Sequence, residues 1–197
     1  MESRCILASA SPRRREILER LGLDFTVFPA DVDESSDERD PERLCEELSR
    51  RKGEEAIRRL VAMGQDPGDR LVIASDTVVA VDGEILGKPR DEADACRMLR
   101  LLSGRSHRVV SGIFLSKGGR SAVSHTVTEV TFAPLSDRDI DRYLASGEPF
   151  GKAGAYAVQG LASVWIREIR GDYFSVVGLP VNRLCELYRA TFGGNLI

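Results

Sequence analysis

The sequence contains few of the features that mark secreted, membrane-spanning or zinc-binding proteins. Its four cysteines are widely scattered and form no CxxC pair and no cluster with histidine, which argues against a disulfide framework and a zinc site. No apolar run approaches the roughly 20 residues that span a bilayer, and no signal-peptide core is present. The net charge of -3 offers no broad attraction to nucleic acid. We therefore expect a cytoplasmic protein with neither a membrane nor a nucleic-acid partner.

The sequence also lacks several familiar catalytic signatures. It has no G-x-S-x-G, no Walker-type glycine loop and no G-x-G-x-x-G. The two histidines, His107 and His125, fall on predicted strands and have no paired carboxylate in the sequence around them, so both are interpreted as structural. Ser/His/Asp catalysis therefore has little support.

What the chain does contain is an alternation of strand-like and helix-like segments that is typical of a mixed α/β fold. Its length predicts one sizeable domain over residues 1–197. Strands are predicted at residues 5–8, 25–28, 71–74, 78–81, 109–115, 123–132, 164–166 and 174–177, the last two as a hairpin. Helices are predicted to begin at residues 12, 41, 92, 137 and 181, mostly from Ser, Asp and Pro signals.

The most informative stretch runs from Ser9 to Arg15, between an apolar strand and an apolar-periodic helix. Pro12 suits the first helical position, and Ser11 suits the N-cap. The free N–H groups of a helix start favour an anion, whereas arginines in the first turn oppose the helix dipole. Positive side chains in a first turn, where the dipole favours negative ones, indicate a binding site. We expect a phosphate chain as its ligand. The alternative is a solvated basic turn.

A second group of residues carries charges suited to phosphoryl chemistry. Asp76 follows the apolar strand at 71–74, and α/β folds place their sites at strand ends. Glu34 lies in an acidic loop, Lys52 lies on the long second helix, and Lys88 follows a predicted hairpin. Cations neutralise a leaving phosphate chain, while carboxylates bind a divalent metal or activate water. Each residue also has an ordinary alternative, as a turn former, a solvated loop residue or a surface charge.

Taken in order, these segments resemble the Maf family of nucleoside triphosphate pyrophosphatases, and the match runs nearly end to end. The matching motifs are Leu7-Ala8-Ser9-Ala10-Ser11-Pro12-Arg13-Arg14, Asp33-Glu34, Lys52, Ala74-Ser75-Asp76-Thr77-Val78-Val79, Gly87-Lys88-Pro89, Leu102-Ser103-Gly104, Lys152-Ala153-Gly154-Ala155-Tyr156 with Gln159-Gly160, and Val177-Gly178-Leu179-Pro180. One departure is Gly53, where alanine is more usual, and it leaves the local helix geometry open. The resemblance implies a mixed, elongated central sheet flanked by helices, with two lobes and a cleft between them.

The resemblance also implies an activity and roles for particular residues. Family members hydrolyse nucleoside triphosphates to the monophosphate and pyrophosphate with a divalent metal, Mg²⁺ or Mn²⁺. Asp76 corresponds to the proton acceptor. From their charge we expect Glu34 and Asp76 to bind the metal, and the sequence leaves open whether Asp76 acts as base, as metal ligand or as both. We expect Ser9, Arg13, Arg14, Lys52 and Lys88 to bind the phosphates, because an anionic substrate needs cations and a hydroxyl near the helix start. Arg15 is expected to be only a solvated neighbour.

Three positions that sort the family by substrate correspond to Arg13, Thr77 and Gln159. The branch that prefers 7-methyl-GTP typically carries Trp, Gln and Glu there, so this chain resembles the branch that prefers dTTP and UTP. A Gln amide offers a donor and an acceptor, which match the O4 and N3–H edge of thymine or uracil.

Two other functions stay open at this point. One is a pyrophosphatase for 7-methyl-GTP or other modified nucleotides, and the other is a non-catalytic nucleotide-binding regulator of septum formation. An exposed strand edge or the last helix could mediate a homodimer.

Overall fold

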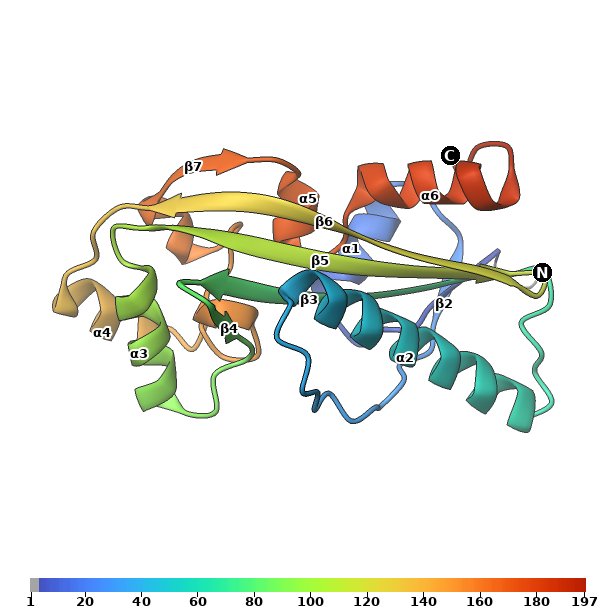
Figure 1. Cartoon of the computed structure of the whole chain (residues 1–197), viewed down its shortest axis with the longest axis horizontal. Helices are drawn as coiled ribbons and strands as arrows, with labels where there is room; N and C mark the ends of the chain where they lie inside the picture. The colour runs from blue at the N-terminus through green and yellow to red at the C-terminus, as the bar shows by residue number, and fades with distance from the viewer. Residues whose placement is uncertain (1–3) are drawn as a thin grey trace.

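The computed structural model describes residues 4–197, which form a mixed sheet with helices on both sides (Figure 1). Within these residues the sheet has seven strands: β1 (Cys5–Leu7), β2 (Phe25–Val27), β3 (Leu71–Val81), β4 (Glu84–Leu86), β5 (Ser106–Lys117), β6 (Arg120–Phe132) and β7 (Ile166–Arg170). Their order is β2-β1-β3-β5-β6-β7, and β4 pairs with part of β3. β1 runs parallel to β2 and β3, and the other pairs are antiparallel. The predicted mixed α/β fold is confirmed.

Three long antiparallel strands, β3, β5 and β6, give the molecule its elongated shape (Figure 1). Gly118 and Gly119 form the turn between β5 and β6, and both adopt positive φ, which costs glycine little. β3 is one continuous strand where the sequence predicted two shorter pieces, because β5 pairs with it without a break. Asp76 therefore lies in the middle of β3, and the prediction that it follows the end of a strand is wrong.

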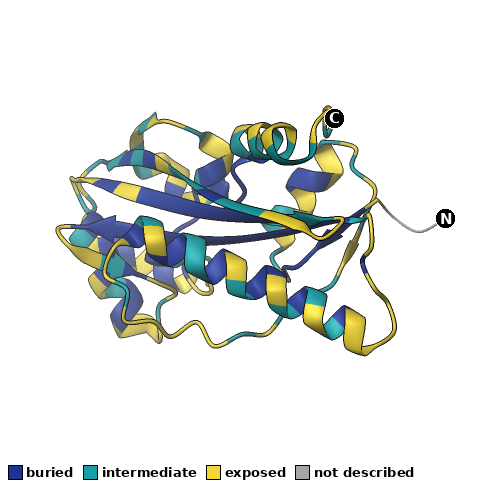
Figure 2. Cartoon of the chain, turned by 45° about the vertical axis from the view of Figure 1, so that its right-hand side comes forward, coloured by how far each residue is buried: buried dark blue, intermediate teal, exposed yellow. Residues whose placement is uncertain are grey.

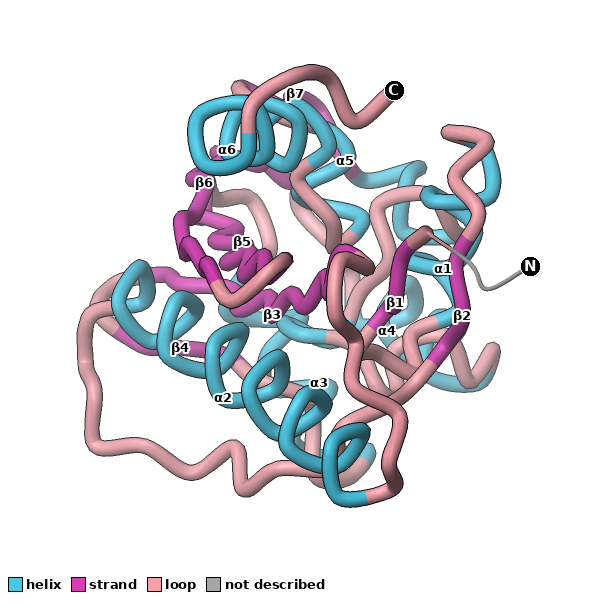
Figure 3. The backbone as a smooth tube through the Cα atoms, turned by 90° about the vertical axis from the view of Figure 1, so that its right-hand side faces the viewer, coloured by secondary structure: helices cyan, strands magenta, loops and turns pink. Residues whose placement is uncertain are grey.

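The helices cover both faces of the sheet. In the described chain the α-helices are α1 (Pro12–Arg20), α2 (Pro41–Ala62), α3 (Glu92–Leu102), α4 (Asp137–Ala145), α5 (Tyr173–Val177) and α6 (Val181–Phe192). The predicted helix starts at residues 12, 41, 92, 137 and 181 are confirmed. α2 and α6 lie on opposite sides of β5 and β6 (Figures 1 and 3). Across residues 4–197, none of the helices has both the length and the apolar character that crossing a membrane would require.

Because helices cover both faces of the sheet, the side chains at the start of β3 are apolar on both faces. Leu71 and Ile73 pack in the main hydrophobic cluster, whereas Val72 and Ala74 pack in a second cluster with residues of α2. Figure 2 shows the buried residues concentrated along the central strands. Each large aliphatic side chain buried in this way contributes about 1.5–3 kcal/mol to folding.

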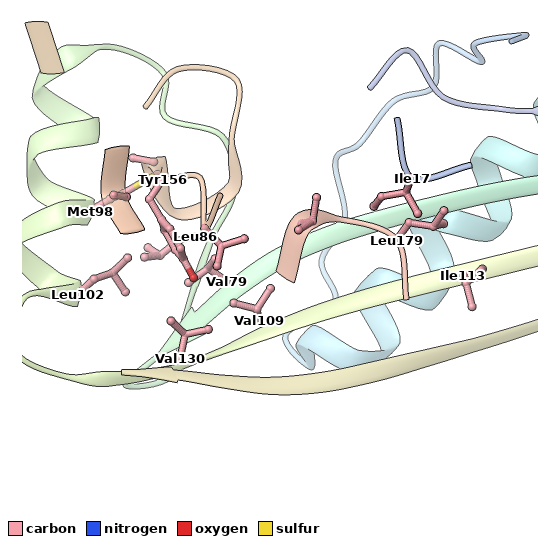
Figure 4. Packing of buried hydrophobic residues seen from close by; sticks show 14 of the residues in the cluster. Ile17, Val79, Leu86, Met98, Leu102, Val109, Ile113, Val130, Tyr156 and Leu179 are labelled. Atoms are coloured by element: carbon pink, nitrogen blue, oxygen red, sulfur yellow. The ribbon is translucent and has the colours of Figure 1, made fainter. Parts of the chain in front are cut away.

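The main hydrophobic cluster extends into two lobes (Figure 4). At one end Val79, Met98 and Tyr156 gather from β3, α3 and the loop after α4. At the other end Ile17 of α1 packs near Leu179, which follows α5. The long strands β3 and β5 run between the two groups and join them (Figure 4).

The hairpin predicted near the C-terminus is wrong. Leu161–Trp165 form a 3-10 helix, β7 follows it, and α5 stands where the second strand of the hairpin was predicted. The carboxylate of Asp172 accepts a hydrogen bond from Phe174 N at 2.8 Å and caps the start of α5. Aromatic and β-branched residues favour strands on average, but the cap and the packing of this short helix against β5 and β6 prevail here.

Candidate active site

A pocket of about 380 Å³ opens between the two lobes, which is a size typical of small-molecule sites. Its walls come from the start of α1, the loop before α2, α2, β3, the turn after β4, the loop after α4 and the end of α5. All the site residues predicted from the sequence line this pocket: Ser9, Arg13, Arg14, Glu34, Lys52, Asp76, Thr77, Lys88 and Gln159. The fold therefore brings together residues from widely separated segments.

The pocket exists because two strands that share one edge of β3 leave a gap between them. β1 pairs with β3 only as far as Ile73, and β4 pairs with β3 only from Val79 onward. Within residues 4–197, no strand pairs with this edge between those two positions, and Asp76 lies there. α/β folds place ligands beyond the carboxyl ends of parallel strands, and the strand that ends here is β1.

Alternation along β3 sends Asp76 and Thr77 to opposite faces of the sheet. Asp76 faces α2, where Lys52 Nζ lies 2.5 Å from Asp76 Oδ1. Thr77 faces α5, and its hydroxyl shares a hydrogen bond of 2.8 Å with Ser111 Oγ, directly across on β5. Ser111 in turn donates to Ser175 O of α5 at 2.7 Å. The gap at the strand edge gives both Asp76 and Thr77 access to one pocket.

Lys52 is the centre of a charge cluster. Its ammonium group also lies 2.8 Å from Glu34 Oε1, and Lys88 Nζ lies 3.3 Å from Glu34 Oε2. The side chains of Lys52 and Asp76 are 11% and 10% exposed, so Lys52 is not the ordinary surface lysine that the sequence left open. Burial raises the pKa of Glu34, but the hydrogen bonds and charges of Lys52 and Lys88 outweigh burial and lower that pKa overall.

Two glycines allow α2 to approach the sheet closely enough for Lys52 to reach Asp76. Gly53 is buried against the ring of Phe114, and Gly112 of β5 is packed against the main chain of α2 at Cys45. A Cβ atom at either glycine would overlap its neighbour. α2 continues through Gly53 without interruption, so this departure from the family pattern serves close packing and does not break the helix.

The two arginines at the start of α1 are anchored to the end of α5. Arg13 Nε donates to Val177 O at 3.2 Å, and Arg14 Nε donates to Gly178 O at 2.7 Å. Gly178 has a φ of 128°, a conformation that other residues rarely adopt. These bonds explain why a basic first turn is tolerated, because carbonyl oxygens at the end of α5 offset part of its charge.

Arg14 is bonded more extensively than its neighbours. It also donates to Ser9 Oγ at 3.1 Å and to Thr77 Oγ1 at 3.4 Å, and further N–H groups of the guanidinium remain to meet a ligand. Burial lowers the pKa of Arg14, and the Asp76 carboxylate partly offsets this effect. Arg15, by contrast, has a side chain that is 63% exposed and forms an ion pair within its own helix, as expected of a solvated neighbour.

Gln159 lies on the opposite wall, in the loop that follows the short 3-10 helix Ala153–Ala155. It is exposed, and its amide makes no hydrogen bond to any residue in the described part of the chain. The neighbouring Tyr156 also lines the pocket, and its hydroxyl is 2.8 Å from Nε2 of the buried His107. His107 thus supports the pocket wall, in keeping with the structural role expected of it.

Sequence reasoning missed several residues that build the site. Lys152 lines the pocket, and burial together with the charge of Arg13 lowers its pKa. A signal for Lys152 was available, since it lies in a matched motif. Ser111 and Ser175 support Thr77 but stand in apolar stretches with no distinguishing pattern. The remaining histidine, His125, lies outside the pocket and contacts glutamates of α2 that the sequence spacing did not reveal.

Glu34 and Asp76 are the residues that suit a divalent cation. Their carboxylates contact the same ammonium group, that of Lys52, so their oxygens converge on one position. Within residues 4–197, no group of three or more His, Cys, Asp or Glu side chains is arranged to hold a metal. Mg²⁺ usually binds through one or two carboxylates together with substrate phosphates and water. The pair therefore fits a metal that enters with a phosphorylated ligand, and not a metal held by protein side chains alone.

The structure is therefore that of an α/β protein with a binding pocket at an open sheet edge. The cations and carboxylates in this pocket suit an anionic ligand. The family model described as "Maf-like protein" matches residues 4–191, nearly the whole chain. The chain belongs to the Maf family.

Similar proteins support this assignment over their full length. A protein from Agathobacter rectalis named dTTP/UTP pyrophosphatase is 46% identical, covering 95% of this chain and 97% of its own. Proteins of the same name from Chromobacterium violaceum and Thermococcus onnurineus are 47% and 45% identical, covering 99% and 95% of this chain and 98% of each relative. Among solved structures, the Staphylococcus aureus Ham1 protein aligns over 66% of this chain and 71% of its own, with 20% identity and a TM-score of 0.46.

Proposed function

We propose that this chain hydrolyses dTTP and UTP to the nucleoside monophosphate and pyrophosphate. One observation carries the proposal: the carboxylates of Glu34 and Asp76 and the cations Arg13, Lys52 and Lys88 line a single pocket. A triphosphate needs cations to offset its charge, and an attacking water needs a positioned base. The proposal is also supported by full-length similarity, at 46% and 47% identity, to proteins named dTTP/UTP pyrophosphatase.

The triphosphate binds to the cationic side of the pocket. Arg13, Arg14, Lys52 and Lys88 offset its charge, and Ser9 and the free N–H groups at the start of α1 contribute hydrogen bonds. Arginines in the first turn of a helix are repelled by the positive end of its dipole. An anion bound there is attracted both by the arginines and by the dipole. The arrangement at the start of α1 is therefore favourable when the phosphate chain is present.

The base is selected by Arg13, Thr77 and Gln159. The exposed amide of Gln159 has no partner among residues 4–197, so its donor and acceptor are available to the O4 and N3–H edge of thymine or uracil. A base with a different pattern of donors and acceptors would leave polar groups unpaired, which is what gives such a site its discrimination.

Asp76 accepts a proton from the attacking water. The water oxygen forms a bond to the α-phosphorus, the bond from the α-phosphorus to the bridging oxygen breaks, and pyrophosphate leaves with the electron pair. The hydrogen bond from Lys52 to Asp76 fixes the direction of the carboxylate. Mg²⁺ or Mn²⁺ held by Glu34 and Asp76 would supply charge neutralisation to the triphosphate.

The test is pyrophosphate release across a panel of nucleoside triphosphates with Mg²⁺, Mn²⁺ and EDTA. We expect dTTP and UTP to be the fastest substrates and EDTA to abolish turnover. Asp76→Asn should lower kcat by about 10²-fold or more, as the loss of a general base does. Asp141→Asn, a matched change on the exposed side of α4, should leave kcat unaltered.

Three outcomes would contradict parts of this proposal. Faster hydrolysis of 7-methyl-GTP than of dTTP and UTP would refute the assigned substrate. Full activity of Asp76→Asn would remove Asp76 from the catalytic role. Nucleotide binding without any release of pyrophosphate would favour the non-catalytic regulator.

A homodimer and a cytoplasmic location remain predictions. Light scattering on the purified chain tests the first, and cell fractionation tests the second.

A further inference from the structure

A partly buried hydrogen-bond network beneath the Gln159 loop has no part in the chemistry described above. Glu148 lies in the loop after α4, and its carboxylate turns toward the segment that follows Gln159. Glu148 Oε2 accepts a hydrogen bond from Leu161 N at 3.0 Å, and Oε1 lies 3.5 Å from Ala162 N. The carboxylate thus holds the main chain two and three residues beyond Gln159.

Tyr143 of α4 extends the same network to the other side of Gln159. Its hydroxyl donates to Glu148 Oε1 at 2.8 Å and accepts a hydrogen bond from Ala157 N at 3.1 Å. Burial and the hydrogen bond to Glu148 raise the pKa of Tyr143, so the phenol keeps the proton that it donates. Ala157 lies two residues before Gln159, so the loop is fixed on both sides of that residue.

The residue after Gln159 is adapted to this arrangement. Gly160 packs directly on the Glu148 carboxylate, and a Cβ atom at position 160 would overlap both carboxylate oxygens. The φ of Gly160 is -103°, which any residue can adopt. The glycine is therefore needed for the close approach of the carboxylate and not for the backbone conformation.

The consequence for Gln159 is a fixed main chain with a free side chain. Its neighbours on both sides are hydrogen-bonded to Glu148 and Tyr143, while its own amide has no partner within residues 4–197 and lines the pocket. A recognition group that is held in place before the ligand arrives loses less entropy on binding and discriminates more sharply.

We propose that Glu148 and Tyr143 are positioning residues that set base selectivity by holding the Gln159 loop against the pocket. This inference rests on the proposed function, because it presumes that Gln159 contacts the base. Neither Glu148 nor Tyr143 lines the pocket, so both act through the loop and not by touching the nucleotide.

The decisive variant is Glu148→Gln. Three donors converge on the carboxylate, and an amide would turn its own NH₂ group against one of them. We expect the ratio of kcat/KM for dTTP to kcat/KM for dCTP to fall about tenfold, a loss of the size seen when a hydrogen bond to a charged group is removed. The Ki of inorganic triphosphate, which has no base, should stay within about twofold of the wild-type value because the cationic wall is untouched.

Two further variants make the test specific. Tyr143→Phe removes only the hydroxyl, is the milder change if Glu148→Gln folds poorly, and should lower the same ratio. Tyr188→Phe is the matched control, because it removes a hydroxyl that bonds to Lys117 away from the pocket, and it should leave the ratio unaltered.

A double variant separates positioning from general damage. In a Gln159→Ala background, where the base contact is already lost, Glu148→Gln should cause no further fall in the dTTP to dCTP ratio. The inference is overturned if Glu148→Gln raises the Ki of triphosphate while leaving the ratio unchanged, or if its effect on the ratio adds fully to that of Gln159→Ala. If the wild-type chain hydrolyses no triphosphate, the proposed function fails and this inference fails with it. If the wild-type chain selects dTTP and the variants do so equally, only this inference fails.

Discussion

Replacing Lys52 by methionine should destabilise the folded protein, because the change leaves the Asp76 carboxylate without its partner in a buried position. The Nζ of Lys52 lies 2.5 Å from Asp76 Oδ1, and the two side chains are 11% and 10% exposed. Methionine preserves most of the volume and apolar length of the lysine side chain, so the effect of the lost charge is separated from the effect of lost packing.

The size of the effect follows from the geometry of the pair. At 2.5 Å and an effective dielectric constant of about 20, the direct attraction is about 7 kcal/mol. Desolvation of both ions offsets most of this attraction in the intact protein. Removing one partner leaves the other ion desolvated and unpaired, which typically costs about 3–5 kcal/mol. We expect about 3 kcal/mol, at the lower end, because the pocket admits water beside Asp76.

The assay is urea unfolding of Lys52→Met at pH 7, with the wild-type chain as reference. The double variant Lys52→Met, Asp76→Asn contains neither charge and should regain about 2 kcal/mol relative to Lys52→Met alone. A double-mutant cycle with no coupling between the two positions would refute this account of the pair.

The matched control is Lys88→Met. The side chain of Lys88 is 60% exposed, and its ion pair with Glu34, at 3.3 Å, is open to solvent. Such pairs contribute about 0–1 kcal/mol, so Lys88→Met should cost less than about 1 kcal/mol. If the two lysine variants lose the same stability, burial is not what makes Lys52 different, and the reasoning fails.

Burial lowers the pKa of His107 from 6.5 to about 4. Between these two pH values the unfolded chain binds more protons than the folded chain. The free energy of unfolding should therefore fall by about 3 kcal/mol as the pH drops from 6.5 to 4. Urea titrations should show that this pH-dependent loss of stability is absent from His107→Phe. A variant whose stability depends on pH as the wild type's does would contradict the assignment to His107. Gly112→Ala should cost about 3 kcal/mol or more, since its Cβ would overlap the main chain at Cys45. Gly53→Ala should cost about 1–2 kcal/mol, less than Gly112→Ala, because its Cβ would overlap a side chain and not the main chain, and because alanine favours the helix. Thermal unfolding compares the two, and a greater loss for Gly53→Ala would contradict the packing argument.

Local signals predicted the helix starts because the interactions that form them lie within a few residues. The carboxylate of Asp40 accepts from Glu42 N at 2.9 Å, and Asp91 accepts from Asp94 N at 2.8 Å. A third helix begins with a capping box at Ser136. These contacts need no tertiary structure, so the sequence alone was enough to place them.

Predictions failed where distant packing overrides local preference. The sequence of α5 resembles a strand by composition, yet it forms a short helix that packs against β5 and β6. Asp76 was expected after a strand end, yet it stands within β3, because pairing with β5 carries that strand past it. Neither the partner strand nor the packing surface can be read from residues nearby in the sequence.

The sequence by itself determined the family and named many of the residues that line the pocket, because several motifs, such as Ser9 to Arg14, occur together in the order that the family has. Only the tertiary structure decided how those charges pair. Lys52 on α2 reaches both Glu34 from a loop and Asp76 from the middle of β3. That meeting depends on the register of the sheet and on the close approach of α2, which are set by packing across the whole chain.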